Sequence, residues 1–458
     1  MSKSSKKCCD YQIRWKNYRP FEDTGWLTLR PITILIGTNN SGKSSVLSPL
    51  LLLNQTIKSH DVETPILTQG PLVDVGNFRD FVHLHDQSRK VFFGLRFHTH
   101  EIPNKCKPVG AYPPGGMAIT FASDDKSHQI KLIKNELSDV FNRPYTAHTV
   151  GSGSTRYSLS GPLDNTGMKK REQKAIKNTV PVNFLFSPNA TLYAYEKFGS
   201  VKNPSSKSEQ FSKPFSHYLQ VLGFTYSSIR AFFSDISYVG PLRKKLERYY
   251  RVAAESPLTV GTQGENAPNL FRQKQKLLQK ETNNWIKKFE FGTALRCQNL
   301  TNDLFELLFV DGKKETNVAD AGFGASQVLP LIIQALAAPK DSLTIVEQPE
   351  IHLNPRLQGT LSDLFVHMAK AGHRVLVETH SEHLLIRLRR LVASGEISSK
   401  DVGIYFVEKQ NDVSKIREVT IEENGHISRE QWPQGFFDDT LRESLALASA
   451  QSNSQREH

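Results

Sequence analysis

The first third of the chain alternates apolar and polar residues with the two-residue period of β-strands. Residues 11–36 follow this pattern and end in an apolar, partly β-branched run from Ile32 to Ile36, which predicts two or three strands. Residues 43–57 contain a run of leucines and no glycine, which predicts a helix with a buried face. Beyond residue 80, short alternating runs separated by "YPPGG" and "SDDKS" predict an antiparallel meander.

The pattern changes twice more along the chain. Residues 142–213 are rich in Ser, Gly, Asn and Lys, which predicts long loops on an inserted region, and helical patterns dominate residues 215–308. Strands are then predicted at 343–346, 374–378 and 402–408, with helices at 357–371 and 381–393. This alternation is typical of a parallel sheet covered by helices, so we expect an α/β fold.

The composition indicates the cellular compartment of the protein and the redox state of its cysteines. A hydrophobic content of 38% in 458 residues supports a folded interior. The apolar run 46–53 is far shorter than the roughly 20 residues of a membrane span, and the N-terminus lacks a secretory signal. These features predict a cytoplasmic protein with no membrane contact. The four cysteines match no disulfide framework or metal-ligand spacing, so we interpret them as free thiols.

The net charge of +12 leaves the type of partner open. Lys and Arg near a phosphate backbone release condensed counterions, so the charge suits DNA or RNA. Solvated basic faces and anion-rich protein partners give the same balance. Residues 240–251, "GPLRKKLERYYR", combine five basic residues with two tyrosines and could grip a nucleic acid. A solvated helix face, or arginines that reach a nucleotide or a dimer partner, is an equal alternative.

A phosphate-binding loop is the strongest motif. "GTNNSGKS", residues 37–44, satisfies the G-x-x-x-x-G-K-[ST] pattern between a predicted strand and a predicted helix. Its glycines let successive N–H groups face a phosphate, the lysine would bridge the β- and γ-phosphates, and the serine hydroxyl would ligate Mg²⁺. The predicted nucleotide-binding residues are Gly37, Asn39, Asn40, Ser41, Gly42, Lys43, Ser44 and Ser45.

Three later stretches follow in a fixed order. "DAGFGASQVLPLI" is a turn before an apolar helix, and Gly322, Gly324 and Ser326 could form a second anion site there. "LTIVEQPEIHLNP" is a strand that ends in acidic residues, and "RVLVETHSEHLLIRL" places His380 just after a strand. Each stretch alone has a structural explanation. Their joint order after a P-loop favours a nucleotide hydrolase.

This order resembles that of the ABC-class ATPases, in the SMC and RecF-like branch. The chain is more closely similar to stand-alone ATPases related to the overcoming-lysogenization-defect proteins, many of them from prokaryotic phage-defence systems such as the Septu ATPase subunit. The resemblance rests on "YVGPLRKKLERYY", "VGTQGENAP", "GFGASQVLP", "EQPEIHLNP", "ETHSEHLL" and "WPQGFFDD". It implies an ABC-type P-loop core with an antiparallel β-subdomain and an inserted helical and loop-rich region.

The resemblance also implies domains. They are an N-terminal ATPase lobe at 1–141, an insertion at 142–308, a C-terminal ATPase lobe at 309–440 and a tail at 441–458. Two subunits would sandwich two ATP molecules in a homodimer or higher homo-oligomer, each P-loop facing the partner's turn 322–326. His380 would contact the γ-phosphate, and Glu347 would take the metal-side acid position. Gln69, or alternatively Gln55, would assist the Mg²⁺.

The hydrolytic base is the open question. Gln348 takes the position of the usual catalytic Glu, and a glutamine cannot accept a proton. Either Glu350 orients the attacking water with help from Gln348, or hydrolysis is intrinsically slow and ATP acts mainly as a conformational ligand. We favour slow hydrolysis assisted by Glu350. A structural alternative is that Glu350 only favours a helix dipole.

Three functions remain as hypotheses. The leading one is an ATP-dependent sensor or switch that controls a separate effector, a nuclease or a toxin, in antiviral defence. The alternatives are an SMC/RecF-like DNA-binding ATPase of DNA repair and an ATPase fused to its own nuclease. Only about 50 residues follow Glu408, too few for the usual nuclease domain of the resembling family. The spelling of the signature turn and the long insertion argue against a transporter ATPase.

Overall fold

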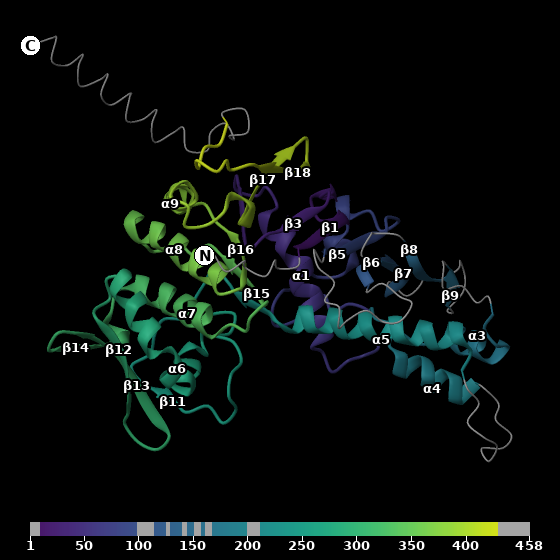
Figure 1. The fold of residues 1–458 in the computed structure, drawn as a ribbon, viewed down its shortest axis with the longest axis horizontal. Helices are drawn as coiled ribbons and strands as arrows, with labels where there is room; N and C mark the ends of the chain where they lie inside the picture. Colours follow the sequence, from purple (N-terminus) through teal and green to yellow (C-terminus); the bar gives the residue numbers. More distant parts are fainter. Residues whose placement is uncertain are drawn as a thin grey trace, which may run out of the picture.

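The computed structural model describes residues 10–98, 114–124, 129–139, 144–150, 157–160, 167–198 and 211–428. Their strands form three sheets. In Figure 1 a six-stranded sheet lies between a lobe built from the N-terminal half and a lobe of helices from the C-terminal half. The "WPQGFFDD" stretch and three cysteines lie outside the described residues; Cys297 is a free thiol, as predicted.

The central sheet joins both ends of the chain. Its strand order is β10-β15-β16-β4-β17-β18, and all neighbours pair in parallel except the last two. The strands are β4 (Ile32–Gly37), β10 (Ile236–Val239), β15 (Leu343–Glu347), β16 (Arg374–Glu378), β17 (Val402–Gln410) and β18 (Val413–Val419). The predicted α/β class with a parallel core is therefore confirmed.

Helices and a second sheet cover the two faces of this sheet. Alternate strand residues point to opposite faces, so Leu35 packs with α1 and the antiparallel sheet, while Ile34 and Ile36 pack on the other side. Helix α1 (Lys43–Ile57) lies on the Leu35 side. The helices on the other side are α6 (Ala267–Lys288), α7 (Phe323–Ala337), α8 (Pro355–Lys370) and α9 (Glu382–Ala393). Burial on both faces explains why these strands are apolar throughout.

The predicted antiparallel meander is part of an eight-stranded sheet of order β2-β1-β5-β6-β7-β8-β9, with β3 beside β1. It also takes in the first strands of the chain, so residues 11–36 give four strands rather than two or three. The strands are β1 (Asp10–Tyr18), β2 (Phe21–Asp23), β3 (Leu27–Leu29), β5 (Val91–His98), β6 (Pro114–Ser123), β7 (Ile130–Asp139), β8 (Pro144–Val150) and β9 (Tyr157–Ser160). A short helix, α2 (Phe78–Phe81), precedes β5.

The region predicted as long loops is more regular than expected. Strands β8 and β9 extend the sheet beyond residue 141, and two helices follow, α3 (Lys170–Lys177) and α4 (Pro188–Phe198). The long helix α5 (Lys213–Ser234) runs along this lobe in Figure 1. Phe184 and Phe215 are fully buried in the same core as α1. Tertiary burial of a few aromatic residues outweighs the polar composition that suggested loops.

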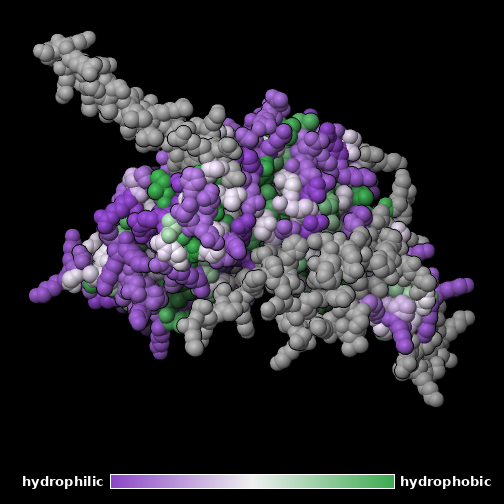
Figure 2. Space-filling model, turned by 45° about the horizontal axis from the view of Figure 1, so that its top comes forward, coloured by the Kyte–Doolittle hydropathy of each residue, from purple (hydrophilic) through white to green (hydrophobic). Residues whose placement is uncertain are grey.

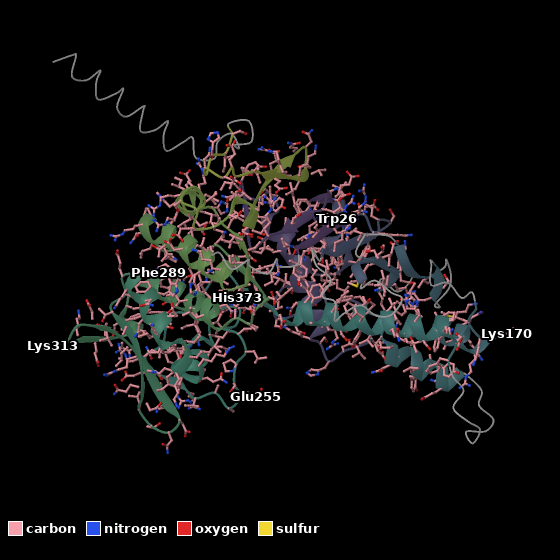
Figure 3. All side chains as sticks on the ribbon, viewed as in Figure 1. Trp26, Lys170, Glu255, Phe289, Lys313 and His373 are labelled. Carbon is pink, nitrogen blue, oxygen red and sulfur yellow. The ribbon has the colours of Figure 1, made fainter. Side chains whose placement is uncertain are left out.

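The predicted helical region also contains strands. β10 belongs to the central sheet, although it lies inside the predicted insertion 142–308. A separate four-stranded sheet consists of β11 (Tyr250–Arg251), β12 (Ala294–Asn299), β13 (Leu304–Asp311) and β14 (Lys314–Asn317), with Lys313 in the turn between the last two strands (Figure 3). The insertion therefore does not form a separate unit at the predicted boundary. None of the described helices combines the length and apolar content that crossing a bilayer requires.

Candidate active site

The phosphate loop lies between β4 and α1, as predicted. Gly37 and Gly42 have φ angles of 154° and 97°, and a Cβ on Gly37 would lie 2.1 Å from the Val407 carbonyl oxygen. Only glycine fits these two positions. Gly42 is also the N-cap of α1 and offers no side-chain cap, so the first amides of the helix stay available to an anion.

The loop lysine and serine hold protein partners that a nucleotide could replace. Lys43 Nζ donates to the carbonyl oxygens of Gly37 and Thr38, at 3.1 and 2.8 Å. The buried Ser41 hydroxyl has no hydrogen-bond partner. Ser44 Oγ donates to Glu378 Oε2 at 2.8 Å. A loop with free amides, an orphaned hydroxyl and a lysine bonded only to carbonyls fits a polyphosphate.

A row of acidic side chains crosses the carboxyl end of the sheet. Glu347 and Glu378 are register partners on β15 and β16, so they point to the same face, the one that packs on α1. On the far side of Glu347, Tyr238 of β10 donates its hydroxyl to Glu347 Oε1 at 2.9 Å. The row therefore runs from Tyr238 through Glu347 and Glu378 to Ser44.

The row of acidic side chains predicts that the free energy of unfolding of the protein depends on pH. Burial first, and then the charge of Glu378, raise the pKa of Glu347 to about 7. The folded protein therefore binds more protons than the unfolded chain between about pH 4.5 and 7, and its free energy of unfolding falls as the pH rises through that window. We expect urea titrations to show this slope in the wild type and a shallower one in Glu347→Gln. An unchanged slope would contradict the expectation, and Glu22→Gln, an exposed carboxylate, is the control.

The structure brings Glu350 next to the backbone of His380. Glu350 is 9% exposed, its Oε1 accepts from the His380 amide at 2.7 Å, and its Oε2 has no partner. Burial raises the pKa of Glu350. Burial and the Lys43 charge lower the pKa of His380, which favours a neutral imidazole near the phosphate loop. A carboxylate with one free buried oxygen is a plausible acceptor for a proton.

Gln348 lies between these groups in an unusual backbone conformation. Its φ is 44°, in the left-handed region, and its amide donates to the Glu378 carbonyl oxygen at 2.7 Å. Left-handed backbone at a residue with a side chain costs of order 1 kcal/mol and is held only by surrounding contacts. The turn that follows the acidic strand is therefore fixed on both sides.

One of these contacts comes from Arg243, a residue of the basic stretch 240–251. Arg243 is 5% exposed and donates to the carbonyl oxygens of Glu347 and Gln348, at 2.7 and 3.3 Å, and to Gln327 Oε1 at 3.3 Å. Burial lowers its pKa to about 10, so it stays charged at neutral pH. Arg243 therefore joins the end of the acidic strand to α7.

The rest of the basic stretch is exposed. Lys244 and Lys245 face solvent, and Arg248 pairs with Asp320 at 2.5 Å on the surface. Tyr249 is 58% exposed. The stretch is thus divided between one buried structural arginine and a solvated basic face, and it is not a single contact surface.

The signature turn is only partly presented to the outside. Gly322 is exposed, and the neighbouring Phe323 is 46% exposed and contacts the His352 ring at 4.6 Å. Gly324 is half-buried. Ser326 is 3% exposed, and its Oγ accepts from the Leu246 amide at 3.2 Å. The structure therefore corrects the prediction for Ser326, because a buried, hydrogen-bonded hydroxyl cannot face a partner's nucleotide.

The two glutamine candidates for Mg²⁺ lie elsewhere. Gln55 is buried near the end of α1, about 16 Å from Ser44 along the helix. Its amide bonds four backbone groups of the loop 67–73. Gly70 packs against the Gln55 side chain, which places Gln69 at this distant end as well, exposed. The metal prediction for Gln69 and Gln55 is corrected, because loop support and not ion binding occupies this end of the helix.

Three functional residues were missed at the sequence level. Glu378 ends the strand 374–378, Tyr238 precedes the "VGPLR" segment, and Arg243 is the last residue of that segment. A carboxylate at the end of a predicted parallel strand was a usable signal for Glu378. No sequence signal separates buried Arg243 from the exposed basic residues beside it.

Together, the glycine-built phosphate loop on a parallel sheet and the acidic row at the carboxyl ends of its strands define a P-loop nucleoside triphosphatase. The model of the AAA ATPase domain family matches residues 11–385, and a model described as a protein of unknown function matches residues 397–447. The chain belongs to the AAA ATPase domain family. It is therefore an ATPase by family, for which nucleotide binding is implied.

Solved structures of SMC head domains show a remote likeness. One, an SMC head bound to the C-winged helix domain of ScpA, has 11% identity and a TM-score of 0.45, with 90% of this chain and 98% of that chain covered. Another, the SMC head domain from Thermotoga maritima, has 11% identity and a TM-score of 0.37, with 91% and 100% covered. None of the curated proteins matches the chain.

Proposed function

We propose that the protein is a slowly hydrolysing ATP switch that dimerises around ATP and controls a separate effector, a nuclease or a toxin, in antiviral defence. The observation that carries the proposal is the end of β15, where an amide, Gln348, stands in the expected place of the base and a buried carboxylate, Glu350, lies two residues away. A missing base slows hydrolysis by roughly 10²- to 10⁴-fold. ATP would then hold one conformation for a long time.

In this proposal the phosphate loop binds the polyphosphate through Lys43 and the amides of α1. Mg²⁺ supplies charge neutralisation at the phosphates, next to Ser44 and the acidic row. Glu350 accepts the proton of the attacking water, and Gln348 hydrogen-bonds that water. In this proposal the exposed part of the signature turn, Gly322 and Phe323, faces the partner's nucleotide across a twofold axis.

The assignment of the base can be tested with two substitutions. We expect Gln348→Glu to raise the turnover number about tenfold or more, because it restores a carboxylate at the position that the family resemblance gives to the base. Glu350→Ala is expected to lower it about 100-fold. Phosphate release from purified protein under single-turnover conditions measures both.

The control is Glu382→Gln, a carboxylate substitution in the first turn of α9, next to the site in sequence. It is expected to leave turnover within about twofold of the wild type. Unchanged turnover in Glu350→Ala would remove Glu350 as the base and leave intrinsic slow hydrolysis as the mechanism.

A second candidate function, an SMC/RecF-like ATPase that binds DNA, is favoured by surface charge. A cavity of about 360 Å³ between α6, α8 and α9 is lined by Lys288, Arg356 and Arg387, although Arg387 pairs with Asp363 and Arg356 pairs with Glu290, so DNA would have to compete with these carboxylates. Among the residues that Figure 2 colours by hydropathy, hydrophilic ones predominate and hydrophobic ones gather only in small groups. Salt-dependent binding of duplex DNA that Arg356→Glu weakens would favour this function. ATP-dependent capture of a nuclease without DNA binding would favour the first.

A further inference from the structure

We propose that Glu378, at the end of β16, is the carboxylate that holds the nucleotide's divalent cation together with Ser44, in the role that the family resemblance gives to Glu347. The inference rests on the proposed function in one respect, that the phosphate loop binds a metal-nucleotide complex. It gives a role to Glu378, a residue of the "ETHSEHLL" stretch to which the sequence analysis assigned none.

The first observation is the distance between a side-chain oxygen of Ser44 and one of Glu378. Ser44 Oγ and Glu378 Oε2 are 2.8 Å apart. Mg²⁺ binds oxygen at about 2.0–2.1 Å in octahedral geometry, which places neighbouring ligands about 2.9 Å apart. The two oxygens therefore already stand at the separation of adjacent ligands, and the hydroxyl proton between them lies at the edge of the position that a cation would take.

Strand order carries the second step. β16 is the direct neighbour of β4, which leads into the phosphate loop, whereas β15 is one strand further away. Neighbouring strands lie about 4.8 Å apart, so an acid at the end of β16 reaches the loop first. Glu347 has its Oε1 bonded to the Tyr238 hydroxyl, on the side of β15 that faces away from the loop.

Charge and burial carry the third step. Glu378 is 4% exposed, and the charges of Lys43 and Glu350 both act on it. Glu350 Oε2 is a buried carboxylate oxygen without a hydrogen-bond partner. The three carboxylates Glu347, Glu350 and Glu378 outnumber the two buried cations that act on them, Lys43 and Arg243. A divalent cation beside Ser44 would supply the missing positive charge, while Ser44 itself is exposed enough to admit it.

The test uses Mn²⁺ as a spectroscopic probe of the full-length protein. Free Mn²⁺ is measured by electron paramagnetic resonance during titration in the presence of a non-hydrolysable ATP analogue, for the wild type, Glu378→Gln and Glu347→Gln. We expect Glu378→Gln to weaken Mn²⁺ binding at least tenfold and Glu347→Gln to weaken it less than threefold. The readout does not depend on turnover, and both variants keep the size of the side chain.

A double substitution distinguishes shared ligation from misfolding. If Ser44 and Glu378 hold the same ion, Ser44→Ala should weaken Mn²⁺ binding as well, and the double variant should be less affected than the product of the two single effects. Binding of the metal-free nucleotide in EDTA should stay within about threefold of the wild type in all three variants, since Lys43 and the loop amides are intact.

Two other outcomes overturn separate claims. Equal or greater weakening in Glu347→Gln than in Glu378→Gln, with nucleotide binding retained, would overturn the assignment of Glu378 and restore Glu347. Absence of any nucleotide binding by the wild type would overturn the proposed function, and the inference with it. The failure of one is therefore distinguishable from the failure of the other.

Discussion

Replacement of Lys43 by Met is expected to abolish detectable ATP binding, with a loss of at least about 100-fold in affinity, because the lysine supplies the charge-assisted hydrogen bonds to the phosphates. Lys43 is 5% exposed and donates to two loop carbonyl oxygens. Burial lowers its pKa, so a bound polyphosphate would also restore a charged partner to a desolvated cation. Equilibrium titration with a fluorescent ATP analogue measures the loss.

The matched control for this prediction is Lys400→Met. Lys400 is exposed and lies in the short 3-10 helix Ser399–Asp401, just before β17 begins. It removes the same charge and should leave affinity within about twofold, since exposed charges are screened by solvent and salt. Retention of ATP binding within threefold in Lys43→Met would show that the loop does not bind phosphate in the predicted way. Circular dichroism of both variants checks that the fold is kept.

Replacement of Arg243 by Met is expected to lower the free energy of unfolding by about 2–4 kcal/mol, because the carbonyl oxygens of Glu347 and Gln348 and the Gln327 amide oxygen lose a charged donor in a buried place. The rate of ATP hydrolysis should fall by more than the loss of folded protein explains, because the turn that carries Gln348 and Glu350 loses its support. Urea unfolding and single-turnover phosphate release measure the two effects.

The exposed arginine of the same stretch gives the comparison. Arg248 pairs with Asp320 at the surface, where solvent screens the pair, and Arg248→Met should leave the urea unfolding midpoint nearly unchanged. Arg243→Lys should rescue little, because an ammonium lacks the fork that reaches several acceptors at once. Unfolding of Arg243→Met within about 0.5 kcal/mol of the wild type would contradict a structural role for the buried guanidinium.

The predicted site divides into a part that the sequence located and a part that it could not. The loop between a strand and a helix, the strand that ends in acidic residues and the strand before His380 were predicted where the structure has them, because each is a local pattern of strand, turn and helix. Ser326 was placed outward although it is buried, and Gln69 was placed near the ion although it lies at the far end of α1. Both errors concern the direction or distance of a side chain, which local pattern does not set.

The fold shows the same division. Helix 43–57 and strand 374–378 were predicted with their observed bounds, since helical and strand periods are properties of consecutive residues. Strand β10, by contrast, was missed inside a helical region, because it becomes a strand through pairing with β15, more than 100 residues later. Pairing energy of this kind is tertiary, and a short segment alone does not reveal it.

The sequence by itself determined that this protein has a P-loop on an α/β core and an amide where a base is expected, because glycine spacing and residue identity are local facts. Only the tertiary structure decided which acid meets Ser44. Strand order places β16 beside β4, and that neighbourhood brings Glu378 within 2.8 Å of a residue 334 positions away in the chain. It also turned Arg243 inward, since the carbonyl groups that need it come from another part of the chain.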